Sequence, residues 1–152
     1  MHWSDRLYRS LIAVADLVNR LDIDSRLLSA AGVKLDRALF PLLARVAMSP
    51  GINVAEMSNL VGRDHSTVSR QVVKLEKLGL IVRTPDPVDS RARRLHLSDQ
   101  GSAIMAKVKA IRRQWMEGHF QDWSEKDRDD LVDLLQEMIG KDWQTGIPPA
   151  RT

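Results

Sequence analysis

The sequence predicts a fold that is mainly α with one small two-stranded β-hairpin. Apolar residues recur at intervals of three and four along most of the chain, which is the period of a helix. Only residues 80–98 alternate apolar and polar side chains at the period of a strand. The 152 residues are 43% hydrophobic and 28% charged, which is enough to bury a core without disulfides or metals.

The first helix is expected from Ser4 to about Leu28, within an N-terminal helical region of residues 4–30. Its apolar face follows steps of four and three: Leu7, Leu11, Val14, Val18 and Leu21. Gly32 is expected to end this region. A second helix turns the following residues inward: Leu39, Leu42, Leu43, Val46 and Ala47. Asp36 is a candidate cap, and Pro41 indicates a start nearer Leu39 because proline lacks a backbone donor.

Two short helices joined by a tight turn come next. Asn53, with Glu56 three residues on, is typical of a capping box. The first short helix carries the apolar residues Val54, Met57, Leu60 and Val61, and Gly62 ends it. Asp64 is a candidate N-cap for the second. The apolar face of the second helix is Val68, Val72, Leu75 and Leu78, and Gly79 ends it. This pair predicts a helix-turn-helix.

The hairpin follows directly, with strands over residues 80–84 and 94–98. Period-two alternation places Leu80, Val82, Leu95 and Leu97 on one face and Ile81, Arg83, Arg94 and His96 on the other. The loop between the strands is long and holds Pro85 and Pro87. A helix-turn-helix with such a hairpin is a winged helix, which we expect to form a lobe of residues 36–97.

The C-terminal region, residues 98–140, is expected to form two further helices. Ser98 starts a long helix that reaches about Phe120, with Ile104, Val108, Ile111 and Trp115 inward. Ser124, with Asp127 three residues on, caps the last helix, whose apolar residues are Leu131, Leu134, Leu135, Met138 and Ile139. Residues 144–152 hold a glycine and two prolines and are expected to be a loose tail.

Composition excludes several classes of function. The chain has no cysteine, so it lacks disulfides, thiol nucleophiles and cysteine-containing zinc sites. The four histidines show no ligand spacing, and no catalytic or phosphate-binding motif is present, so we expect neither an enzyme nor a cofactor. No apolar run approaches the roughly 18 residues of a membrane span. The N-terminus lacks the pattern of a signal peptide, so a cytoplasmic protein without a membrane partner is expected.

The positive charge is concentrated in one stretch. Residues 62–94 hold eight lysines and arginines and four acids, whereas the net charge of the whole chain is +3. The stretch therefore carries +4 and the rest of the chain −1. A basic patch confined to one region indicates a polyanionic partner, although an ordinary solvated face is the alternative.

Residues 62–101 carry a recognisable set of positions: Ser66, Thr67, Val68, Ser69, Arg70, Leu75, Glu76, Gly79, Leu80, Ile81, Asp86, Pro87, Asp89, Arg91, Leu97 and Gly101. At these positions the chain resembles the MarR family of transcriptional regulators, the group named for multiple-antibiotic-resistance repressors. The resemblance runs from about Leu7 to Ile139 and implies one domain over residues 1–152. It further implies a homodimer joined by the terminal helices, residues 4–30 and 98–140. Such a dimer would act on double-stranded DNA as a repressor, released in many members by a small aromatic or phenolic ligand.

The second short helix presents its polar side to the major groove in this interpretation. We expect Ser66, Thr67 and Arg70 to read bases, with Ser69 beside them. Arg63 and Lys74 are better placed for phosphates. A solvated helix face that touches nothing is the alternative.

The hairpin loop would reach a minor groove, with Arg91 inserted there. Asp89 would hold the Arg91 guanidinium in a fixed pose, and the resemblance points to the same pair. Arg93 and Arg94 would contact phosphates, although plain solvated arginines are nearly as good an interpretation. A winged helix that binds protein instead of DNA is the alternative function.

Aromatic residues gather in the terminal segments: Trp3, Tyr8, Trp115, Phe120, Trp123 and Trp143. Exposed apolar surface of this kind marks a partner interface, which agrees with the homodimer that the resemblance implies. The alternative is that these aromatics fill the core of a monomer.

Overall fold

The computed structural model describes residues 1–143, apart from the side chains of residues 20 and 21. Its elements in chain order are α1 (Trp3–Leu21), α2 (Ile23–Ala30), α3 (Phe40–Met48), α4 (Val54–Val61), α5 (His65–Lys77), β1 (Ile81–Pro85), β2 (Arg93–Leu97), α6 (Asp99–His119) and α7 (Glu125–Ile139). The mainly helical class with a two-stranded wing is confirmed. The expected tail, residues 144–152, lies outside the described residues.

The first helix differs from the expectation, because it is two helices. Asp22 separates α1 from α2 and has a φ of 45°, in the left-handed region. A right-handed helix cannot continue through such a residue, and aspartate is one of the few non-glycine residues that adopt this conformation. Asp22 also pairs with Arg37 (Nε–Oδ1 3.2 Å). The break redirects the chain so that Leu27 and Leu28 of α2 are buried with Phe40 and Val108.

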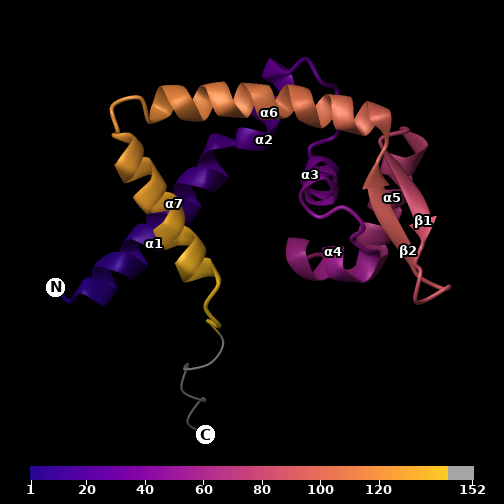
Figure 1. The fold of residues 1–152 in the computed structure, drawn as a ribbon, viewed down its shortest axis with the longest axis horizontal. Coiled ribbons are helices and arrows are strands. Elements are labelled where there is room, and N and C mark those ends of the chain that lie inside the picture. The colour runs from indigo at the N-terminus through magenta and orange to yellow at the C-terminus, as the bar shows by residue number, and fades with distance from the viewer. Residues whose placement is uncertain (144–152) are drawn as a thin grey trace, which may run out of the picture. The chain divides into compact units, whose positions relative to one another are not determined.

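The winged lobe has a core drawn from α3, α4, α5 and the hairpin, which lie together in Figure 1. Its fully buried side chains are Leu42, Leu43, Val46, Met57, Val68, Val72, Leu75, Ile81 and Leu95. The start of α3 agrees with the position of Pro41, since Leu39 is the N-cap. Asp36 instead accepts a hydrogen bond from the Ala38 backbone in the preceding turn. Leu60 and Leu78, expected inward, are each 52% exposed.

The hairpin register corrects the expected strand faces. Ile81 is opposite Leu97, and Arg83 is opposite Leu95. Directly opposed residues share a face, so Ile81 faces the core with Leu95 and Leu97, whereas Val82 is 45% exposed. Leu80 is also buried, but it lies before the strand, where its backbone nitrogen bonds to the Leu75 carbonyl at the end of α5. The alternation therefore begins one residue later than expected.

Two compact units divide the chain, residues 1–112 and 113–152, with the boundary inside α6. In the first unit, the Ser98 hydroxyl accepts a hydrogen bond from the Gly101 nitrogen at the start of α6, as expected for a cap. In the second unit, Ser124 accepts from the Asp127 nitrogen and caps α7. No residue of α7 is buried. Within the part of the chain described, none of the helices combines the length and apolar character needed to cross a membrane.

Candidate nucleic-acid interface

The turn between α4 and α5 is fixed by three local devices. Asn53 and Glu56 form the expected capping box, with Asn53 Oδ1 accepting from the Glu56 nitrogen at 2.8 Å. Gly62 ends α4 with a φ of 66°, which favours glycine. Asp64 then caps α5 by accepting from the Thr67 nitrogen at 3.0 Å. These bonds set where α5 begins and so which side chains occupy its first turn.

The first turn of α5 carries a network centred on the Asp64 carboxylate. Oδ2 accepts from the Ser66 hydroxyl at 2.6 Å, and Oδ1 accepts from the Thr67 hydroxyl at 2.7 Å. Arg70 Nη2 in turn donates to Thr67 Oγ1 at 3.3 Å. The Ser66 hydroxyl and then the Thr67 hydroxyl and backbone nitrogen hold the pKa of Asp64 well below its ordinary value. Asp64 is therefore ionised at neutral pH and orients the side chains expected to read bases.

The candidates on α5 and in the turn before it differ in exposure. Arg70 and Lys74 are exposed and Ser69 is half-buried. Arg63 is half-buried: its Nη1 donates to the Ala38 carbonyl at 2.8 Å and to Gln71 Oε1 at 2.9 Å. Arg63 thus links α5 to the segment before α3, a structural role that the sequence did not indicate. Its phosphate contact stays a prediction.

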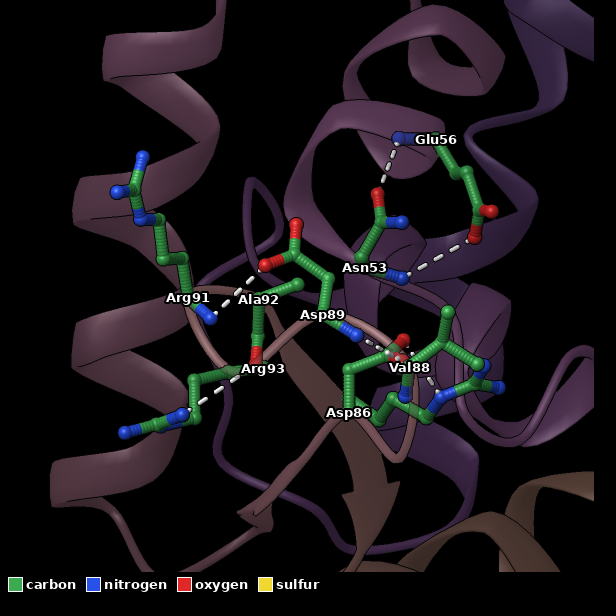
Figure 2. A network of polar contacts seen from close by, with 9 residues as sticks. Asn53, Glu56, Asp86, Val88, Asp89, Arg91, Ala92 and Arg93 are labelled. Atoms are coloured by element: carbon green, nitrogen blue, oxygen red, sulfur yellow. Dashed lines mark hydrogen bonds and ion pairs between the residues drawn. The ribbon is translucent and has the colours of Figure 1, made fainter.

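The wing loop is organised by Asp86, as Figure 2 shows. Asp86 Oδ1 accepts from the backbone nitrogens of Val88 (2.8 Å) and Asp89 (3.1 Å), and Oδ2 pairs with Arg94 Nε at 2.9 Å. The two backbone N–H groups, followed by Arg94, lower the pKa of Asp86. The Asp86 nitrogen also donates to the Ala92 carbonyl, which closes the base of the loop.

The expected pairing of Asp89 with the Arg91 guanidinium is not found. Asp89 Oδ1 accepts from the Arg91 backbone nitrogen at 3.0 Å, and in Figure 2 this nitrogen, not the guanidinium, is joined to the carboxylate. The contact is an Asx-turn, in which an aspartate accepts a hydrogen bond from the backbone nitrogen two residues on. Asp89 therefore orders the loop backbone, and the exposed Arg91 guanidinium projects from that fixed backbone.

The other two wing arginines have different surroundings. Arg93 is exposed, with Nη1 donating to the Ser90 carbonyl at 3.1 Å. Arg94 is committed to Asp86, and its side chain is 42% exposed. A phosphate contact of Arg94 would compete with that pair, so Arg93 is the better candidate.

A hollow of about 420 Å³ lies between the start of α4, the start of α5 and the wing. Its lining includes Asn53, His65, Ser69, Arg83, Arg91 and Arg93. Arg83, which the sequence did not single out as a site residue, comes from β1 and pairs with Glu76 of α5. Three guanidinium groups around one open hollow give this face the character of a polyanion site. The predicted groups that the structure brings together here are thus Ser69, Asp89, Arg91 and Arg93.

Two residues of this interface were missed as functional groups. Asp64 was named only as a cap, although two hydroxyl residues in the first turn of α5 were a visible signal for its network. Asp86 was named only as a match to a family pattern, although Asp-Pro is itself a turn signal.

Residues 34–92 match the family model described as the MarR family. A Thauera aromatica protein assigned as the transcriptional regulator of the hcr operon is 30% identical over 108 residues. This match covers 70% of the present chain and 64% of the relative. Residues 34–92 thus match the MarR family in sequence. The chain's curated relatives are transcriptional regulators and not enzymes.

Solved structures agree with the family assignment at the level of the fold. The MarR family transcription regulator SP03579 is 19% identical, covers 91% of each chain and has a TM-score of 0.68. The transcriptional regulator Tm0710 of Thermotoga maritima is 26% identical over 89% of this chain and 93% of its own, with a TM-score of 0.60. The chain therefore has the winged-helix fold of those regulators.

Proposed function

We propose that this chain is a cytoplasmic homodimeric regulator of the MarR family that binds a pseudo-palindromic site on double-stranded DNA. The observation that carries the proposal is the position of the wing arginines Arg91 and Arg93 around the same hollow as the start of α5. A helix of this kind enters a major groove, and an arginine-bearing loop beside it reaches the neighbouring minor groove. Ser66, Thr67 and Arg70 would read bases, and Lys74, Arg63 and Arg93 would contact phosphates.

The homodimer is supported by apolar surface that the chain leaves uncovered. On α1, the exposed large apolar residues are Trp3, Leu7, Tyr8, Ile12, Val14, Leu17 and Val18. On α7, they are Val132, Leu134, Leu135 and Ile139. So many exposed large apolar residues on a helix indicate a surface that a partner covers, and a two-fold dimer would cover the same residues on both copies. The alternative that the terminal aromatics fill a monomer core has less support, because Trp3, Trp123 and Trp143 are 68%, 44% and 55% exposed.

We propose repression as the sign of regulation, because a dimer seated on an operator that overlaps a promoter would exclude the transcription machinery. Release by a small aromatic ligand stays a prediction from the family resemblance. It would operate by favouring a spacing of the two lobes that no longer matches the half-sites.

Selection of duplexes from a random pool tests the proposal. The expected result is an enriched pair of inverted half-sites about one helical turn apart. Binding to the enriched duplex should weaken steeply with salt, because each neutralised phosphate releases counterions. A winged helix that binds protein would enrich no duplex, and its partner affinity would depend far less on salt.

A further inference from the structure

The hydrogen bonds at the start of α5 determine the direction in which two hydroxyl groups donate. An ionised carboxylate can only accept. Because Asp64 Oδ2 lies 2.6 Å from Ser66 Oγ and Oδ1 lies 2.7 Å from Thr67 Oγ1, both hydroxyl protons must point at Asp64. A serine or threonine at a DNA interface is usually free to donate or accept, but these two are not.

The two hydroxyl oxygens then have different capacities left. Thr67 Oγ1 already accepts from Arg70 Nη2 at 3.3 Å, so it links Asp64 to the guanidinium of Arg70. Ser66 Oγ is exposed, and no other bond among the described residues uses its lone pairs. Ser66 therefore offers acceptors to whatever approaches, and Arg70 offers donors held in position by Thr67.

We propose that Asp64 sets the polarity of the base-reading surface, so that Ser66 selects a base that presents an exocyclic amino group in the major groove. This inference rests on the proposed function. Adenine N6 and cytosine N4 are the donors available there, whereas guanine O6 and thymine O4 accept. Asp64 is a positioning residue, because it acts through Ser66 and, by way of Thr67, through Arg70.

Discrimination arises because the wrong base leaves two acceptors facing each other. To donate to guanine O6 or thymine O4, Ser66 would have to give up its bond to a charged acceptor, which is about twice as strong as a neutral one. The same argument removes Ser66 as a phosphate contact, since phosphate oxygens only accept. Arg70 is unaffected by this restriction and retains its preference for guanine.

The test substitutes Asp64→Asn and repeats the duplex selection with the full chain. Asparagine caps helices as well as aspartate does, but one of its two polar atoms is an NH₂ donor, so it can accept from only one hydroxyl at full strength. The position read by Ser66 is identified as the one whose preference disappears in Ser66→Ala. There we expect the wild type to favour adenine or cytosine over guanine or thymine by about tenfold, and Asp64→Asn by less than about threefold.

Two further variants separate the effect of Asp64 on the direction of the Ser66 hydroxyl from the effect of its negative charge and from its link to Arg70 through Thr67. Asp99→Asn removes the same charge outside α5 and should leave the tenfold preference in place. Thr67→Val keeps the shape of the side chain but breaks the link, so the guanine preference due to Arg70 should weaken while that of Ser66 persists. Thermal unfolding of each variant confirms that it is folded before selection.

The possible outcomes bear on the two proposals differently. If Asp64→Asn kept the full preference, or if the wild type selected guanine or thymine at the position read by Ser66, the polarity inference would be overturned and DNA binding would stand. The inference would also be overturned if Ser66→Ala changed no position. A wild type that enriched no duplex would overturn both proposals together.

Discussion

Gly101, in the first turns of α6, packs against the backbone where β1 begins. A Cβ added there would lie 2.0 Å from the Leu80 carbonyl oxygen and 3.0 Å from its carbon. That carbonyl is not free to move, because it accepts a hydrogen bond from the Ser98 nitrogen at 3.0 Å. Gly101→Ala therefore forces α6 and the start of β1 apart.

The magnitude of the effect can be worked from the distance and from helix propensity. Contacts under 3.0 Å are essentially never seen for a Cβ, so the two backbones must separate by at least about 1 Å. Overpacking of this kind costs about 1–3 kcal/mol. The upper end of this range applies here because the obstacle is backbone and not a flexible side chain. Alanine offsets part of this cost, since its helix propensity is more favourable than that of glycine by about 1 kcal/mol. We expect a net loss of about 1–2 kcal/mol, or about 2–8 °C in Tm for a chain of this size.

Gly118 is the matched control, since it lies in the same helix and has no atom within 4 Å of an added Cβ. Gly118→Ala should gain about 0.5–1 kcal/mol from propensity alone. The assay is thermal unfolding of both variants and wild type at one protein concentration, because a dimer's Tm depends on concentration. A Gly101→Ala protein as stable as wild type would refute the close approach; losses in both variants would show that the effect is not specific to Leu80.

Three further predictions concern the wing and the short helices. Arg91→Ala should reduce the slope of log binding constant against log salt concentration by about 2 for a dimer, because each subunit would lose one phosphate contact worth about 0.9 in slope. An unchanged slope would exclude a charge contact by Arg91. Asp86→Asn should lower amide protection of Val88, measured by hydrogen exchange. The pKa of Asp86 is lowered in the folded state from its ordinary value of 3.8. The extra amide protection of wild type over Asp86→Asn should therefore be complete at neutral pH, and it should be lost as the pH falls below 3.8 through the pKa of Asp86 in the folded state. Asn53→Ala should cost about 0.5–2 kcal/mol in urea unfolding through loss of the N-cap, whereas Asn59→Ala, on the exposed side of α4, should cost nothing.

Local signals predicted the caps and ends of several helices well. Asn53, Asp64 and Ser124 act as caps where the sequence placed them, and Gly62 and Gly79 end helices with φ of 66° and 73°. Each of these signals depends on a residue and its neighbours within four positions, so no tertiary information is needed. The N-terminal break at Asp22 escaped detection because apolar spacing continues across it without a change of period.

Features that depend on partners distant in the chain were predicted less well. The strand faces were wrong because Leu80 is buried by its place after α5 and not by its place in β1. The role of Arg63 depends on the Ala38 carbonyl, 25 residues away. Neither partner can be inferred from alternation or charge, since both are set by how α3, α5 and the hairpin pack.

The acids within the basic stretch have a common explanation in this structure. Asp64 and Asp86 each cost some attraction to a polyanion, yet each accepts hydrogen bonds from backbone N–H groups and so fixes the backbone of the next few residues. The sequence suggested that a wing acid restrains an arginine side chain directly. The structure instead has Asp86 and Asp89 restrain the loop backbone and leaves the Arg91 guanidinium unpaired with either. A guanidinium kept out of an internal ion pair would have no such bond to break on meeting DNA, so its binding would be opposed by loss of side-chain entropy and of hydration but not by a competing carboxylate.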